Sequence, residues 1–227
     1  MKRVDVFLDM TGTITDMESE NLAMLKLAER IKRRFSLDMS AEEIAKKIDE
    51  FRKPFMERRD VEYVPIRYLV LEAVKNIVPK RLCTEESYWI LDEYTKVHGE
   101  YVRLAPGAKE GLRRIRERAE HMGIITDGDR PYTEKLLESL GISDIFDSIT
   151  TAEDAGVGKP NIKIFQMALK NSKSDVKFYI GDSESRDMKG GKSTGMRTIK
   201  IGDWTKYGDY TARDLVEASK IIEKYLR

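Results

Sequence analysis

Four short groups of polar residues are spaced so that together they could form one ligand-binding site. The first is Asp9, which follows a short apolar, β-branched run and precedes a glycine-containing turn. Thr126, Lys159 and the pair Asp182 and Asp187 follow in order, each at or just beyond the end of a further predicted strand. In open parallel sheets, ligands bind beyond the carboxyl ends of the strands. The spacing therefore predicts that these side chains converge on one site, where the carboxylates would suit a hard cation such as Mg²⁺.

The elements that must position these side chains alternate between strands and helices. Beyond Gly107, apolar residues at helical spacing alternate with short apolar runs that are typical of buried strands. This alternation predicts an α/β fold with a doubly wound, Rossmann-like parallel sheet. The strands are expected at residues 4–8, 122–126, 148–150, 176–180 and 197–201.

Only helical patterns appear between the first strand and this alternating region. Four helices are expected there, of which the second ends near Pro54 and the third begins with Pro65. The sequence therefore predicts a core domain formed by residues 1–15 and 104–227, interrupted by an all-helical cap domain of residues 16–103.

The composition argues against several kinds of partner. Lys and Arg number 41 against 40 Asp and Glu, so the net charge of +1 would not draw the chain to nucleic acid or to an anionic membrane. No apolar run approaches the roughly 18 residues of a membrane span, and no signal-peptide pattern precedes the first strand. The single cysteine, Cys83, excludes an intramolecular disulfide and is expected to be a small buried hydrophobic residue. We expect a cytoplasmic monomer or small homo-oligomer.

The four groups, in this order and across the whole chain, resemble the motifs of the haloacid dehalogenase superfamily of aspartate-nucleophile phosphotransferases. The resemblance implies a magnesium-dependent phosphatase that cleaves a small phosphorylated metabolite through an aspartyl-phosphate. Asp9 would be the nucleophile and a metal ligand, and the backbone carbonyl of Thr11 and the carboxylate of Asp182 would be further ligands. Asp187 would support the waters on the metal or orient Lys159.

The resemblance also implies a phosphate cradle and a cap. Lys159 would offset negative charge on the phosphate, and Thr126 would hydrogen-bond a phosphoryl oxygen together with backbone N–H groups as far as Gly128. Asp127 stands where related sequences often have an uncharged amide, and its carboxylate would repel a phosphate unless it is turned away. Residues 16–103 resemble a cap that closes over the site and selects substrates. Basic residues of this region that could meet an anionic substrate, although most are expected to be solvated, are Arg52, Lys53, Arg58, Arg59 and Arg67.

Thr11 stands where phosphatases of the superfamily usually carry a second aspartate. That aspartate protonates the leaving oxygen and then deprotonates the water that hydrolyses the aspartyl-phosphate, and a threonine hydroxyl has no accessible pKa for either task. General acid–base help is typically worth about 10²–10⁴ in rate. We therefore expect slow turnover unless another group acts as the general acid and base. Asp16 and Glu184 are the candidates, because each is close in sequence to a motif.

Thr11 also leaves other interpretations open. The segment from Asp9 to Thr13 is similar to the phosphorylation motif of P-type ion pumps, which hold a longer-lived aspartyl-phosphate, although that similarity is limited to this motif. In a 2-haloacid dehalogenase, Asp9 would attack carbon without a metal. A low-turnover phosphate-binding or regulatory protein on the same fold is the non-enzymatic alternative. Because dehalogenases typically lack the metal-binding aspartate that is present here as Asp182, the sequence favours attack on phosphorus.

Overall fold

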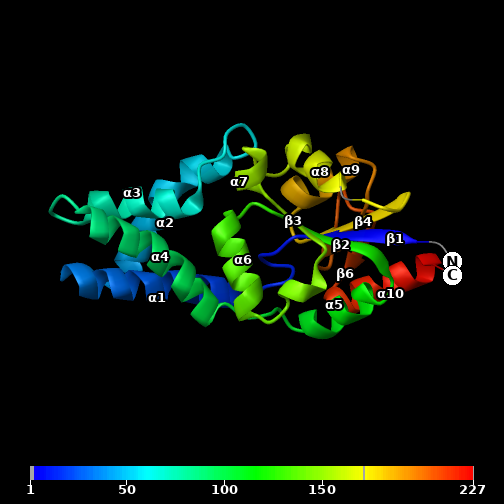
Figure 1. Ribbon diagram of the computed structural model, residues 1–227, viewed down its shortest axis with the longest axis horizontal. Coiled ribbons are helices and arrows are strands. Elements are labelled where there is room, and N and C mark those ends of the chain that lie inside the picture. Colours follow the sequence, from blue (N-terminus) through cyan, green and yellow to red (C-terminus); the bar gives the residue numbers. More distant parts are fainter. Residues whose placement is uncertain (1–2, 171, 227) are drawn as a thin grey trace.

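Six parallel strands form one sheet in the computed structural model, which describes residues 3–170 and 172–226 (Figure 1). The strands are β1 (Val4–Leu8), β2 (Ala119–Thr126), β3 (Ser148–Thr151), β4 (Val176–Gly181), β5 (Arg197–Ile201) and β6 (Tyr210–Ala212). Their order, β3-β2-β1-β4-β5-β6, confirms the predicted doubly wound α/β sheet. β6 is not among the predicted strands because it has only three residues, of which one is buried.

β1 lies in the interior of the sheet, and its side chains alternate between two apolar layers. Val4, Val6 and Leu8 belong to one buried cluster, whereas Phe7 belongs to a second cluster on the opposite face. In Figure 1, α5 and α10 lie along the first face, and α8 and α9 lie along the second. The bounds of the helical segments around the sheet are α5 (Ala108–Arg116), α6 (Arg130–Ser139), η1 (Ser143–Ile145), α7 (Ala152–Ala155), α8 (Ile162–Leu169), η2 (Glu184–Met188), α9 (Lys189–Ser193) and α10 (Leu215–Leu226).

Four helices fill the chain between β1 and α5, and we call them the helical insertion. They are α1 (Met17–Phe35), α2 (Ala41–Glu57), α3 (Ile66–Ile77) and α4 (Thr84–Tyr101). They pack against one another at the end of the molecule that faces the carboxyl ends of the strands, and α6 packs on α4 (Figure 1). Residues 16–103 contain no strand, as their helical periodicity predicts. The division into a core domain and a cap domain stays a prediction.

Two local expectations for the helical insertion are wrong. α2 continues through Pro54 to Glu57 instead of ending near Pro54. A proline removes one backbone donor and crowds the preceding turn, but Pro54 is exposed near the end of the helix, so little packing is lost. Cys83 is exposed rather than buried, because it lies at the start of α4, where its N–H donates to Oε2 of Glu86 at 3.0 Å.

Within the described part of the chain, no helix combines the length and the apolar character that crossing a membrane would require.

The reversal of strand order falls at β1. The chain runs from β1 to β2 and β3 on one side, and then returns to β4, β5 and β6 on the other. Leu8 pairs with Ile124 of β2 and with Ile180 of β4. Residues that follow these three strands, including Asp9 and Asp182, therefore emerge side by side at the switch point where open α/β sheets bind ligands.

Candidate active site

Asp9 follows β1 directly and lies at the base of a cavity. Its backbone N–H still donates to the carbonyl of Ile180 at 2.9 Å, and the residue is 6% exposed. The chain then turns at Gly12, where φ is +79°. A Cβ atom at Gly12 would lie 2.7 Å from Oδ2 of Asp182. Glycine is required there both by the backbone angle and by the close approach of two loops that build the site.

Lys159 joins two buried carboxylates. Its Nζ lies 2.5 Å from Oδ1 of Asp9 and 2.6 Å from Oδ1 of Asp187, and it donates to the hydroxyl of Tyr179 at 3.1 Å. Burial acts against the charge of Lys159, but Asp187 and Asp9 outweigh it and raise the pKa of the ammonium group. Lys159 is therefore a fixed cation between the two carboxylates.

Asp187 is held in place from several sides. Its Oδ1 also accepts from the hydroxyl of Tyr179 at 2.9 Å, and its Oδ2 accepts from the backbone N–H of Ser183 at 2.9 Å. Burial favours the protonated carboxyl group, but Lys159 and these donors lower its pKa. A charged Asp187 thus fixes the ammonium group of Lys159 beside Asp9.

Asp9, Asp182 and Asp187 form a cluster of carboxylates. One oxygen from each lies within 4.8 Å of the others. Oδ1 of Asp182 is buried and has no hydrogen-bond partner among the described residues. Burial and the neighbouring Asp187 raise the pKa of Asp182, and burial raises that of Asp9 against the opposing effect of Lys159. Buried negative charge of this kind requires a partner, and the all-oxygen donor set fits a hard divalent cation.

Thr126 and Gly128 line the same cavity where β2 ends. The hydroxyl oxygen of Thr126 accepts from the backbone N–H of Gly128 at 3.1 Å, and the residue is 5% exposed. Because the hydroxyl acts as an acceptor in this bond, its own proton is free to point toward a ligand. The two residues therefore lie where the sequence places a phosphate cradle.

Asp127 lines the cavity too, but its carboxylate is turned toward cationic and N–H groups. Oδ1 accepts from the backbone N–H of Lys159 at 2.7 Å. Oδ2 accepts from Nη1 of Arg59 at 3.2 Å and lies 3.5 Å from Nη1 of Arg186. These partners explain how a carboxylate is tolerated beside a predicted phosphate site. Arg186 is not among the residues singled out from the sequence, where it has no motif to mark it.

Thr11 is turned toward a carboxylate that sequence reasoning missed. Its hydroxyl donates to Oε1 of Glu20 at 3.3 Å. Thr15 donates to the same oxygen at 2.9 Å, and Tyr132 donates to Oε2 at 2.9 Å. Burial raises the pKa of Glu20, although the three hydroxyl groups oppose this effect. The only signal in the sequence is an acidic residue in the first turn of the helix that follows the Asp9 motif.

The two residues expected to substitute for the missing aspartate have other partners. Asp16 caps α1 by accepting from the backbone N–H of Ser19 at 2.9 Å. Glu184 accepts from the backbone N–H of Tyr207 at 3.1 Å. Among the described residues that line the cavity, neither is present. The structure instead brings Glu20 to Thr11.

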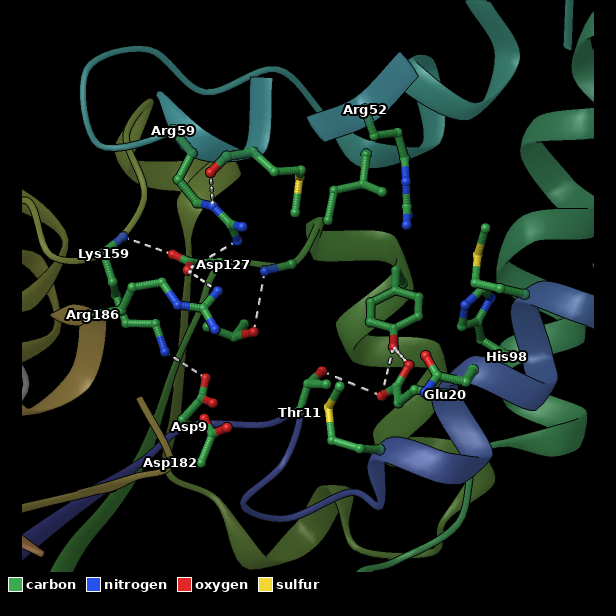
Figure 2. Close-up of a pocket in the computed structure, with 18 of the residues that line it drawn as sticks. Asp9, Thr11, Glu20, Arg52, Arg59, His98, Asp127, Lys159, Asp182 and Arg186 are labelled. Atoms are coloured by element: carbon green, nitrogen blue, oxygen red, sulfur yellow. Dashed lines mark hydrogen bonds and ion pairs between the residues drawn. The ribbon is translucent and has the colours of Figure 1, made fainter. Parts of the chain in front are cut away.

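Residues of both the Asp9 and the Glu20 clusters line one cavity of about 310 Å³, which has two distinct ends (Figure 2). We call one the charged end, and it is formed by Asp9, Lys159, Asp182 and Asp187. We call the other the hydroxyl end, and it is formed by Thr11, Glu20, Tyr132 and His98. In Figure 2, Thr11 lies between the labelled carboxylates of the charged end and Glu20.

Two of the five basic residues predicted to meet a substrate line this cavity. Arg52 and Arg59 reach it from α2 and from the residues just after α2 (Figure 2). Lys53 and Arg58 are exposed instead, and Arg67 pairs with acidic residues that follow β2 and β3. Because only Lys53 and Arg58 are exposed, the expectation that most of the five are solvated is wrong: the other three are partly buried against neighbouring residues.

Comparison with known proteins gives a family match and similar solved structures. The profile of the haloacid dehalogenase-like hydrolases matches residues 6–201. A glyceraldehyde 3-phosphate phosphatase of Pyrococcus furiosus is 39% identical over 118 residues, which cover 51% of this chain and 47% of that protein. The chain thus spans about half the length of this curated relative.

Two solved structures show how widely this fold is shared. A phosphatase from Thermococcus onnurineus has a TM-score of 0.66 and 26% identity, with 98% of each chain covered. A 2-haloacid dehalogenase from Pseudomonas syringae has a TM-score of 0.73 and 20% identity, with 99% of this chain and 100% of that chain covered. The fold alone therefore does not separate attack on phosphorus from attack on carbon.

Proposed function

The chain belongs to the haloacid dehalogenase-like hydrolase family, and we propose that it is a phosphatase that hydrolyses a small phosphomonoester through an aspartyl-phosphate on Asp9. The observation that carries this proposal is the charged end, where a buried carboxylate at the switch point lies 2.5 Å from a fixed ammonium group and beside two further carboxylates. Similarity to proteins named as phosphatases supports it. Because Asp182 and Asp187 suit a cation that attack on carbon does not need, they favour phosphorus over a carbon–halogen bond.

Asp9 is the proposed nucleophile. Since Lys159 engages Oδ1, Oδ2 is the oxygen that attacks phosphorus. The bond from phosphorus to the leaving oxygen breaks, the phosphoryl group is transferred to Asp9, and the leaving oxygen takes its proton from solvent because Thr11 cannot supply one. Water then attacks the same phosphorus, which releases phosphate and restores the carboxylate. Lys159 stabilises the negative charge that develops in both steps.

The cradle at the end of β2 binds the phosphoryl oxygens. The hydroxyl of Thr126 donates to one of them, and the backbone N–H of Asp127 can donate to another, whereas the N–H of Gly128 holds the Thr126 hydroxyl in place. Preorganised donors of this kind are effective because they need no reorientation when charge builds up in the transition state.

Asp9, Asp182 and Asp187, with the backbone carbonyl of Thr11, are the groups that would hold Mg²⁺. The unpartnered Oδ1 of Asp182 supports this assignment. When bound, the cation supplies the positive charge that lets an anionic carboxylate approach an anionic phosphate.

Thr11 makes the second step slow in this proposal. Its hydroxyl donates to Glu20 and offers no titratable proton. Substrates with a good leaving group need little protonation, so they should phosphorylate Asp9 readily. The phosphoenzyme should then accumulate, because activation of water lacks a general base at this position.

The size and lining of the cavity support a small hydroxylated substrate. Its volume of about 310 Å³ is at the lower end of the roughly 300–1,000 Å³ typical of ligand sites. The carboxylate of Glu20 and the imidazole of His98 offer acceptors for hydroxyl groups at the end opposite the phosphate. A triose or other sugar phosphate fits these features, in keeping with the name of the Pyrococcus furiosus relative.

The experiment that tests this proposal is an initial-rate comparison of an aryl phosphate with triose, sugar and nucleotide monophosphates, with and without Mg²⁺. We expect Mg²⁺-dependent release of phosphate, with sugar phosphates preferred over nucleotides. Release of halide from a 2-haloacid, with no phosphate released from any ester, would contradict the proposal.

A further inference from the structure

Asp127 places a negative charge at a site proposed to bind a phosphate dianion. Its carboxylate is 9% exposed and lines the same cavity as Asp9. Its two oxygens lie against one backbone N–H and two guanidinium groups, those of Arg59 and Arg186. Two guanidinium groups and one carboxylate leave one net positive charge at the cavity wall.

Arg59 is held rigidly against the core of the molecule. Its Nε donates to the carbonyl of Met56 at 2.7 Å, and its own carbonyl accepts from the backbone N–H of Gly158 at 2.6 Å. A Cβ atom at Gly158 would lie 2.7 Å from Cγ of Arg59, so the arginine packs directly on the turn that carries Lys159. Burial lowers the pKa of Arg59, and Asp127 opposes this effect. Guanidinium groups nevertheless stay charged in proteins.

Arg186 approaches the same place from the opposite side, from η2. Its Nε lies 3.3 Å from Oγ of Ser183. Burial acts against its charge, but Asp127, Asp187 and Asp9 outweigh it and raise its pKa. In Figure 2, its side chain lies between Asp127 and Asp9.

We propose that Asp127 is a positioning residue that holds Arg59 and Arg186 as a clamp for the phosphoryl group of the substrate. Within the described residues, the contacts of each arginine engage Nε and Nη1 and leave Nη2 to donate to phosphoryl oxygens. Both arginines line the cavity together with Asp9 and Lys159. This inference rests on the proposed function, since it assigns the phosphoryl contacts of the same site.

The clamp makes phosphate binding depend on docking of the helical insertion. Arg59 belongs to the segment between α2 and α3, and that segment is fixed to the core by other bonds. The carboxylate of Asp129 accepts from the backbone N–H groups of Ile66 at 2.7 Å and Arg67 at 2.9 Å. The backbone N–H of Tyr63 donates to the carbonyl of Gly156 at 3.2 Å. In this docked arrangement Arg59 reaches Asp127 at 3.2 Å.

The test is the affinity for inorganic phosphate in the presence of Mg²⁺, measured by calorimetry. Arg59→Ala and Arg186→Ala should each weaken binding by about 10- to 100-fold, as expected for charge-assisted hydrogen bonds. Arg58→Ala is the matched control, because Arg58 is an exposed arginine next to Arg59. It should leave the affinity within about twofold of wild type, as an exposed charge does.

The Asp127→Asn variant tests the role of Asp127, because the two possible roles predict opposite changes in the affinity for phosphate. If Asp127 acts only through its charge, removing that charge would tighten phosphate binding. The clamp predicts about tenfold weaker binding, because the arginines lose the ion pairs that aim them. In the Arg59→Ala background the effect of Asp127→Asn should shrink, which marks the two residues as coupled.

Several results would overturn the clamp. They are tighter or unchanged phosphate binding by a folded Asp127→Asn variant, equal effects of Arg59→Ala and Arg58→Ala, or no phosphate binding by wild type. Thermal unfolding of each variant checks that it is folded. Failure of the proposed function would give a different result. If wild type binds phosphate through the two arginines but hydrolyses no phosphate ester, the clamp is supported and the phosphatase activity is contradicted.

Discussion

The charged end and the hydroxyl end of the cavity are built in different ways. At the charged end, Asp9 and Asp182 directly follow strands, and Lys159 ties Asp9 to Asp187 within 2.6 Å. At the hydroxyl end, a loop and three helices bring together Thr11, Glu20, Tyr132 and His98, which meet through hydroxyl bonds and ring contacts. The sheet thus places the groups that we propose act on phosphorus, and a loop and three helices place the groups that we propose face the rest of the substrate.

This difference separates two tasks. The charged end has little freedom to vary, because Asp9, Lys159 and Asp187 are buried and their charges depend on one another. The hydroxyl end is neutral apart from Glu20, so we propose that substitutions there alter which leaving group is accepted without disturbing the proposed attack by Asp9. The predictions that follow test this separation.

Removing the proposed nucleophile should have the largest effect. Asp9→Asn keeps the shape of the side chain but removes the attacking oxygen, so turnover of an aryl phosphate should fall by at least about 10⁴-fold. Initial rates measure the loss, and Asp38→Asn, at an exposed position, is the control. An Asp9→Asn variant with nearly wild-type turnover would move the chemistry away from the charged end.

Removing the central cation should destabilise the fold. Lys159→Met leaves Asp9 and Asp187 buried without their ammonium partner, which should lower the free energy of unfolding by about 3–5 kcal/mol. Denaturant unfolding without divalent cations measures this change. Lys163→Met, at an exposed lysine of α8, should have little effect. Equal stability of the two variants would show that the charges of the charged end are not coupled.

Adding a carboxyl group at the junction of the two ends should speed hydrolysis of the phosphoenzyme. Thr11→Asp supplies a general base, which should raise this rate by about 10²-fold. Rapid mixing with an aryl phosphate measures the burst and the later steady rate. Thr11→Asn, which has a similar shape but no titratable proton, should not accelerate the reaction. Equal rates for wild type and both variants would mean that another group already serves as the base.

Lowering the pH should reduce the free energy of unfolding through His98 at the hydroxyl end. Burial lowers the pKa of His98 from 6.5 to about 4, although a bond to the carbonyl of Tyr94 opposes this effect. Because the unfolded chain then binds a proton at higher pH than the folded chain, stability should fall as the pH drops from 6.5 towards 4. One group can contribute about 3 kcal/mol at most. Denaturant unfolding at pH 7 and pH 4.5 measures this effect. The free energy of unfolding should fall less for His98→Gln than for wild type between these two pH values. An equal fall in both proteins would contradict a lowered pKa of His98.

The two ends also differ in how far the sequence predicts them. Asp9, Lys159 and Asp182 follow strands or turns with local patterns, and the parallel sheet brings such positions to one edge whatever the helices do. Glu20 is missed because its contact with Thr11 depends on the angle at which α1 leaves the preceding loop. Arg186 is missed because its pairing with Asp127 joins η2 to the loop after β2, and these two segments are far apart in the sequence. β6 is missed because three residues carry too little pattern.

The central claim is that Asp9 carries the phosphoryl group during turnover. The most direct measurement is rapid acid quenching of the protein with an aryl phosphate and Mg²⁺, followed by mass spectrometry of its peptides. We predict a phosphoryl group on the peptide that contains Asp9, close to one per chain, because Thr11 slows its hydrolysis. Phosphate release without any phosphorylated peptide, or with the label on a different residue, would contradict the account.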